Sequence, residues 1–128
     1  MSTIKANTLL HSDGSTTTQP SIPALDKRMA KAWVAFNSSG TVAIIDSFNV
    51  SSITDTGTGY FRCNLSVTQN NANYVIVGGG DGNGSGSAHI MYDSAQGAIS
   101  TTSFGMRSFD TTNSARDSAY NSVMIFGS

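Results

Sequence analysis

The segment "KAWVAFNSSGTVAIIDSFNVSSI", from Lys31 to Ile53, consists of two apolar runs on either side of the polar turn "NSSG". Successive side chains of a strand point to opposite faces, so one face carries Ala32, Val34 and Phe36. We expect this face to continue after the turn through Val42, Ile44, Phe48 and Val50. The opposite face is expected to carry Trp33, Ala35, Ala43 and Ile45. Because both faces are apolar, the pattern predicts a hairpin that is covered on both sides.

The chain that follows this hairpin also has the two-residue period of strands. The segment "GYFRCNLSV" places Phe61, Cys63 and Leu65 on one face, which predicts a half-buried strand with Cys63 in the core. Further strands are expected in "ANYVIVG", "SAHIMY", "AISTTSFGMRSF" and "NSVMIFG", separated by clusters of turn-forming residues. The sequence therefore predicts an all-β fold, a small antiparallel β-sandwich of six or seven strands over residues 31–128.

Residues 1–30 have a different character. They show no sustained period, and "HSDGSTTTQPSIP" is a run of hydroxyl and turn-forming residues with two prolines. We expect an extended N-terminal arm whose apolar residues dock it to a larger assembly, namely Ile4, Leu9 and Leu10. The stretch "PALDKRMAKAW" permits one or two helical turns, because most of its residues favour helix and Pro23 suits a helix start.

The composition excludes several classes of protein. Charged residues make up 12% of the chain, with seven Lys and Arg against eight Asp and no Glu, so no basic nucleic-acid footprint is present. No apolar run approaches the length of about 18 residues that spans a bilayer, and the N-terminal apolar run is too short for a signal peptide. We therefore expect a soluble protein made in the cytoplasm. A single cysteine excludes an internal disulfide, so stability must come from packing or association.

The glycine-rich stretch "VGGGDGNGSGSAH" partly matches a calcium-binding loop through Asp81, Asn83 and Ser85. The twelfth position of that loop needs a bidentate Glu, but Tyr92 stands there, and strands are expected on both sides. The stretch also lacks the glycine spacing of a nucleotide-binding loop. We therefore interpret it as an exposed connection between strands, in which Asp81, Asn83 and Ser85 are candidates for contact with a host glycan or a neighbouring subunit.

No catalytic, metal-binding or cofactor-binding residues are predicted. The two histidines, His11 and His89, have no sequence context that marks them, and no nucleophile elbow is present. A thiolate pair of Cys63 with His89 is disfavoured, because burial on an apolar face raises a thiol's pKa. Two of the eight Asp could still approach each other as in a glycosidase, which leaves a small glycan hydrolase as a remote alternative.

Several stretches together resemble a domain that recurs at the C-terminal end of bacteriophage tail fibre and related virion proteins. They are "AKAWVAFNSSGTVAIIDSFNVSSITDTGTGYFRCNLS", "NANYVIVGGG" and the closing "SVMIFG", with "STIKANTLLHSDG" similar to the short leader of such proteins. Three positions depart from the pattern. Ile45 stands where a polar or charged residue is expected, and Arg62 and Cys63 replace the more usual Thr and Val. The additional isoleucine suggests that the second face of the hairpin is buried in a partner.

The resemblance implies a non-enzymatic, homotrimeric virion protein with a leader that docks to the particle and a head that faces outward. The expected trimer contacts are the second face of the hairpin, Trp33, Ala35, Ala43 and Ile45. Two functions remain open. The first is a tail fibre or fibre-tip component that contributes to host adsorption, and the second is a capsid decoration protein that stabilises the shell. Both need an arm and a trimer, so the sequence does not separate them.

Overall fold

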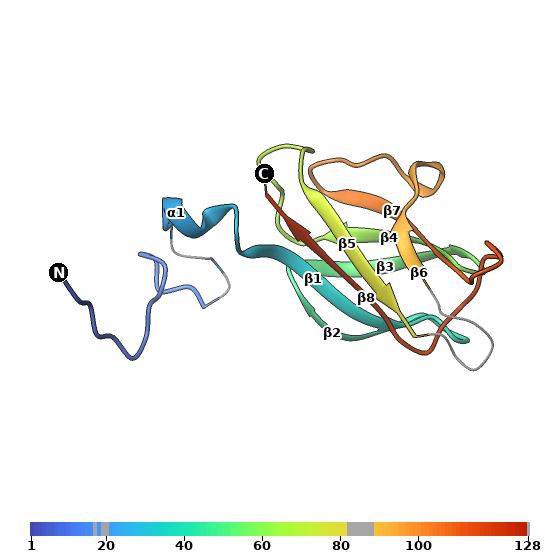
Figure 1. The fold of residues 1–128 in the computed structure, drawn as a ribbon, viewed down its shortest axis with the longest axis horizontal. Helices are drawn as coiled ribbons and strands as arrows, with labels where there is room; N and C mark the ends of the chain where they lie inside the picture. Colours follow the sequence, from blue (N-terminus) through green and yellow to red (C-terminus); the bar gives the residue numbers. More distant parts are fainter. Residues whose placement is uncertain (17, 19–20, 82–88, 128) are drawn as a thin grey trace.

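The computed structural model describes residues 1–127 except 17, 19–20 and 82–88, and within this part the chain is mostly β-strand (Figure 1). A short helix, α1 (Pro23–Asp26), precedes the first strand. The strands, with one 3₁₀ turn among them, are β1 (Ala30–Asn37), β2 (Ala43–Phe48), β3 (Val50–Gly57), β4 (Tyr60–Leu65), β5 (Val75–Gly80), β6 (His89–Tyr92), η1 (Ser94–Gln96), β7 (Ser103–Phe109) and β8 (Asn121–Phe126).

These strands form two four-stranded antiparallel sheets, with the orders β2-β1-β8-β5 and β3-β4-β7-β6. The predicted all-β sandwich is therefore confirmed. The described residues hold eight strands, more than the six or seven expected, because the segment from Lys31 to Ile53 is not a single hairpin. The chain leaves the first sheet at Asn49, which has a positive φ of 56°, and β3 begins in the other sheet.

The core lies between the inner faces of the two sheets. Phe36 of β1 meets Phe61 of β4 edge to face, with ring centroids 5.3 Å apart, and Tyr74 packs against Phe104 in the same way at 6.0 Å. The Tyr74 hydroxyl donates a hydrogen bond to the Ser100 carbonyl oxygen at 2.8 Å, so this buried ring keeps its polar end satisfied. The remaining core side chains are apolar and come from both sheets: Ala32, Val34, Cys63, Leu65, Ile90, Met106, Val123 and Ile125.

A small polar network closes one end of the sandwich. The Asn121 side chain is fully buried, and its amide nitrogen donates to the Ser38 hydroxyl at 3.1 Å and to the Ser118 carbonyl at 3.2 Å. The Ser118 amide in turn donates to the Ser38 hydroxyl at 2.9 Å. These bonds join the turn after β1 to the start of β8. They satisfy the amide nitrogen of Asn121 and the hydroxyl of Ser38, whereas the buried Oδ1 of Asn121 has no hydrogen-bond partner in the described residues.

The N-terminal segment lies to one side of the sandwich (Figure 1). The described residues of 1–22 form turns and extended chain with no helix or strand, and α1 lies within the stretch where a helical turn was expected. Lys31, near the start of β1, forms an ion pair with Asp26 at the end of α1. This contact links the helical turn to the first strand.

Two details of the expected strand pattern are wrong. A bulge between Ala35 and Phe36 shifts the pairing of β1 with β2, so Phe48 lies opposite Trp33 on the outer face and not among the core residues. The first three glycines of the expected loop, Gly78–Gly80, belong to β5. Gly78 faces inward, where a Cβ atom would lie 2.3 Å from Cγ2 of Ile90. Close packing of the two sheets therefore requires glycine at this position.

The neighbouring glycines of β5 allow a matched test of this packing. We expect Gly78→Ala to lower the free energy of unfolding by about 1–3 kcal/mol, because the new methyl group overpacks the contact with Ile90. Gly79→Ala should change it by less than about 0.5 kcal/mol, since its Cβ would meet only the Ser122 hydroxyl, at 3.6 Å. Urea denaturation of both variants measures the difference. Equal stability of the two variants would contradict the inward placement of Gly78.

Candidate interaction surface

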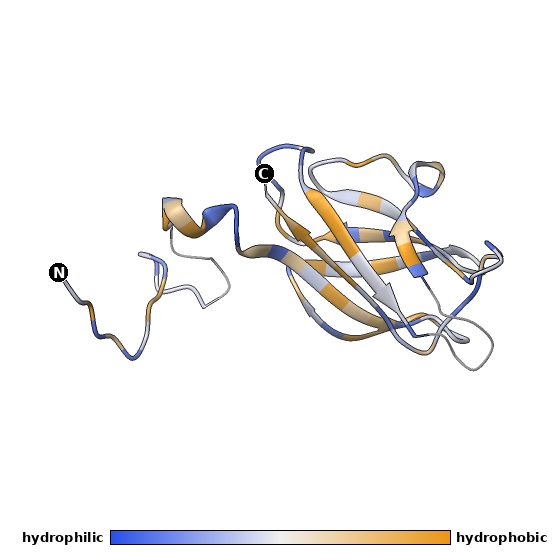
Figure 2. Ribbon diagram, viewed as in Figure 1, coloured by the Kyte–Doolittle hydropathy of each residue, from blue (hydrophilic) through white to orange (hydrophobic). Residues whose placement is uncertain are grey.

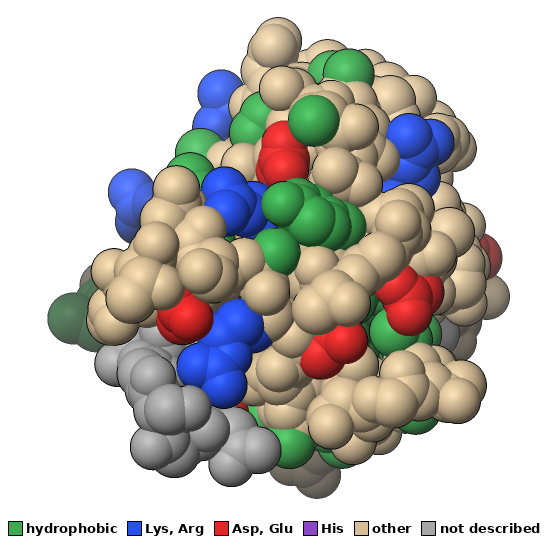
Figure 3. All heavy atoms as spheres, turned by 90° about the vertical axis from the view of Figure 1, so that its right-hand side faces the viewer, with side chains coloured by type: hydrophobic (Ala, Val, Ile, Leu, Met, Phe, Trp, Pro, Cys, Tyr) green, Lys and Arg blue, Asp and Glu red, His purple; other side chains and the backbone are tan. Residues whose placement is uncertain are grey.

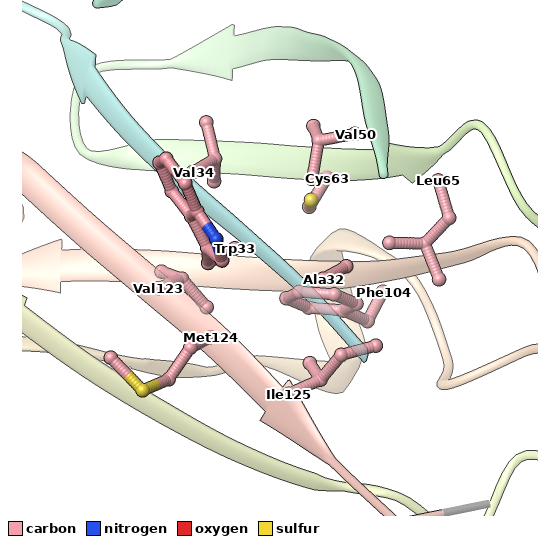
Figure 4. A pocket seen from close by; sticks show the side chains of 10 residues that line it. All are labelled: Ala32, Trp33, Val34, Val50, Cys63, Leu65, Phe104, Val123, Met124 and Ile125. Carbon is pink, nitrogen blue, oxygen red and sulfur yellow. The ribbon is translucent and has the colours of Figure 1, made fainter. Parts of the chain in front are cut away.

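Apolar side chains fill the space between the two sheets that Ala32, Val34, Cys63 and Phe104 help to line. Figure 4 shows side chains of both sheets meeting there, and the space they leave does not admit a water molecule. The lining is apolar, with Val34, Val123 and Ile125 from one sheet and Cys63, Leu65 and Phe104 from the other. This space is the packed core of the sandwich.

The described residues also lack the groupings that metal binding or thiol chemistry would need. No three His, Cys, Asp or Glu side chains come together among them. Cys63 lies on the inner face of its sheet with 1% of its surface exposed, whereas His89 lies on the outer face against Phe109. Burial raises the pKa of the Cys63 thiol to about 12, so the thiolate is not formed near neutral pH.

The outer face of the β2-β1-β8-β5 sheet carries a continuous set of apolar side chains. The strand registers place Phe48, Trp33, Met124 and Val77 in one row across all four strands, because directly paired residues share a face. Val75 and Phe126 form the next row. We call these six residues the outer apolar face, and Figure 2 shows the apolar stretches of β1, β5 and β8 from which most of them come.

The outer apolar face is only partly shielded within one chain. Val75 is 60% exposed, Val77 49% and Met124 39%, while Trp33, Phe48 and Phe126 are partly buried. Burying a large apolar side chain completely stabilises an association by about 1.5–3 kcal/mol. Charged groups lie only near its margin: Asp46 pairs with Ala35, and Lys31 is held by Asp26. The chemistry of this surface suits an apolar partner.

The four residues predicted as trimer contacts have different environments. Trp33 is part of the outer apolar face, and Ala35 is 8% exposed in the middle of the sheet. Ala43 is exposed and pairs with Asn37 at the hairpin end, and Ile45 is 56% exposed at the bulge. Their role in a trimer stays a prediction. Sequence reasoning missed Val75, Val77, Met124 and Phe126 for this surface, although the runs "YVIV" and "VMIF" are apolar at both alternating positions.

The predicted docking residues of the N-terminal segment are all exposed: Ile4 by 89%, Leu9 by 68% and Leu10 by 48%. Asp81, predicted to contact a glycan or neighbour, is also exposed. Asn83 and Ser85 lie outside the described residues. The N-terminal segment and Asp81 therefore present exposed side chains. The virion protein, glycan or neighbouring subunit that they contact stays a prediction.

The opposite outer face, of the β3-β4-β7-β6 sheet, is largely polar. Ser52, Thr54 and Asn64 lie on it and are joined by hydrogen bonds from the Asn64 amide at 3.0 and 2.9 Å to the two hydroxyls. Near them η1 crosses the sheet, and the Arg62 Nε donates to the Gln96 carbonyl oxygen at 3.1 Å. The two outer faces of the sandwich thus differ in chemistry.

No family model, curated protein or solved structure matches this chain. Neither α1 nor η1, the helical elements of the described residues, has the length and apolar character needed to cross a membrane.

The buried thiol predicts a pH dependence of stability. The folded state holds the Cys63 proton up to a pKa of about 12, whereas an unfolded thiol releases it near pH 8.5. The protonated Cys63 thiol therefore contributes fully to the free energy of unfolding below about pH 8.5. This contribution is lost as the pH rises toward 12, and the free energy of unfolding falls by up to ~1.4 kcal/mol per pH unit. Burial also raises the pKa of Tyr74 to about 12, but an unfolded tyrosine titrates only near pH 10.

Urea denaturation between pH 7 and 10 measures this effect. We expect the free energy of unfolding of the unmodified chain to decline above pH 8.5, and that of Cys63→Ala to decline less over the same range. Parallel curves for the two proteins would show that the thiol does not titrate differently on unfolding.

Proposed function

We propose that this chain is a non-enzymatic structural protein of a bacteriophage virion, a tail fibre or fibre-tip component that forms a homotrimer and contributes to host adsorption. The observation that carries the proposal is the outer apolar face, because a single sandwich leaves it uncovered. The link to bacteriophages comes from the sequence resemblance. The resemblance is also the reason for proposing three copies.

Further features support a structural role. No three His, Cys, Asp or Glu side chains come together among the described residues, and the one thiol is buried in the core. The first segment carries exposed apolar side chains outside the sandwich, as a docking segment would. In the proposal, this segment attaches to another virion protein, and the outer apolar faces of three sandwiches cover one another.

Self-association is tested by sedimentation equilibrium of the full chain at micromolar concentration, where we expect a trimer. Val77→Lys places a charge within the outer apolar face and should lower the association constant at least about tenfold. Met91→Lys is the matched control, because Met91 is 52% exposed on the outer face of the other sheet. A folded monomer of the unmodified chain at this concentration would rule out the proposed assembly.

Docking is tested by deleting residues 2–22. The shortened chain should still form trimers, because the outer apolar face is intact, but it should no longer enter virions. Replacing Ile4, Leu9 and Leu10 together by Ser should have the same effect without shortening the chain. Normal incorporation of both variants, measured by mass spectrometry of purified particles, would contradict the docking role. The same measurement gives the copy number, and hundreds of copies per particle would indicate capsid decoration in place of a fibre.

A further inference from the structure

A second surface lies on the outer face of the β3-β4-β7-β6 sheet and consists of Tyr60, Arg107, Phe109 and His89. We call it the cation–aromatic cluster. The strand registers pair Tyr60 with Arg107 and Phe109 with His89, so the four side chains share one face. The cluster lies beside two connections, the turn between β3 and β4 and the segment that follows β7. Both connections lie at the end of the sandwich opposite the N-terminal segment (Figure 1).

Arg107 sits between two aromatic rings. Its guanidinium carbon is 5.8 Å from the Tyr60 ring centroid and 5.3 Å from that of Phe109. The His89 ring, on the neighbouring strand, lies 5.6 Å from the Phe109 ring and is tilted by 33° to it. These contacts surround the guanidinium group with aromatic rings, and Arg107 is partly buried.

The charge of Arg107 has no acidic partner among the described residues. Asp110, on the connection that follows β7, instead pairs with Arg116 at 3.7 Å and accepts a hydrogen bond from the Thr112 hydroxyl at 2.7 Å. Arg107 itself donates one hydrogen bond, from Nη2 to the Asn113 carbonyl oxygen. Its Nε is buried and has no hydrogen-bond partner. A guanidinium group carries five N–H donors, so most of its donor capacity is unused.

We propose that the cation–aromatic cluster binds the carboxylate of an acidic sugar. A carboxylate is the planar anion that a guanidinium group binds through two hydrogen bonds, and the neighbouring aromatic rings offer apolar surface to the sugar ring. This inference rests on the proposed role in host adsorption, for which it names the class of ligand.

The surroundings favour a single carboxylate over a polyanion such as nucleic acid. Figure 3 faces this end of the molecule and shows Asp side chains as well as Lys or Arg side chains, with hydrophobic side chains among them. Asp110 and Asp117 lie on the connection after β7, and the Asp117 carboxylate accepts a hydrogen bond from the Gly59 amide at 2.8 Å. These fixed negative charges repel an extended chain of phosphates. An acidic sugar also offers hydroxyl groups and an apolar ring face, so one of its carboxylates pairs with Arg107 while the ring contacts the aromatic side chains.

To test the inference, the full ¹⁵N-labelled chain is titrated separately with trigalacturonate and with its methyl ester. Binding is followed by NMR spectroscopy. We expect trigalacturonate to shift the Arg107 side-chain signal and the backbone amides of Tyr60 and Phe109. The ester is the same sugar without charge and should bind at least about tenfold more weakly. This comparison uses the unmodified protein, so it does not depend on whether a variant folds.

Variants then assign the site. Arg107→Gln should weaken trigalacturonate binding at least about tenfold, and Arg107→Lys should restore only part of it, because an ammonium group lacks the planar pair of donors. Arg62→Gln is the matched control on the same outer face and should change the affinity by less than about twofold.

Three results would overturn the inference: no binding of trigalacturonate at millimolar concentration, equal binding of the methyl ester, or unchanged binding by Arg107→Gln. Tighter binding of a thymidine oligonucleotide than of trigalacturonate would assign the cluster to polyanions instead. Sedimentation of the same samples reports trimer formation separately. A trimer that binds no acidic sugar refutes this inference alone, and a monomer refutes the proposed assembly.

Discussion

The packing of Phe36 against Phe61 is the contact on which the arrangement of both sheets depends. Each ring is completely buried, and each belongs to a strand that lies in the middle of its sheet. Because a strand alternates its side chains, directing Phe36 inward also directs Ala35 outward, and Trp33 with it. The core contact therefore decides which residues of β1 form the outer surface. The same rule applied to β8 places Val123 and Ile125 inside and Met124 outside.

Much of this inside–outside pattern could be predicted from the sequence where the alternation is unbroken. In β4, Phe61, Cys63 and Leu65 are buried as expected, because polar and apolar residues alternate there without interruption. In β2 the prediction was wrong for Phe48, since one extra residue at the bulge reverses the facing of the residues that follow it in this strand. A bulge cannot be recognised in a segment that is apolar on both faces, and "VAII", residues 42–45, is such a segment.

The glycines of β5 show a second limit of sequence reasoning. A run of glycines is typical of a loop, because glycine has wide conformational freedom and no side chain to pack. In this fold, Gly78 is instead needed in a strand, where the backbone of one sheet approaches Ile90 of the other. That requirement arises from two strands of different sheets, so no local pattern reveals it. The cation–aromatic cluster was missed for the same reason: Tyr60, His89, Arg107 and Phe109 come from three strands that the chain brings together only through sheet pairing.

The two outer faces of the sandwich point in opposite directions, which connects the proposed assembly with the proposed ligand. If three copies cover their outer apolar faces against one another, the β3-β4-β7-β6 sheets face away from the centre of the trimer, and so do the three cation–aromatic clusters. If each cluster binds an acidic sugar through one guanidinium group, each site on its own is weak. Three such sites on the proposed trimer would then act together on a glycan-covered surface, because each bound site raises the effective concentration at the next. Strong attachment then requires no individual site of high affinity. In the proposed trimer, the apolar outer face of each sandwich would lie toward its partners, and the other outer face would carry the ligand sites on the outside.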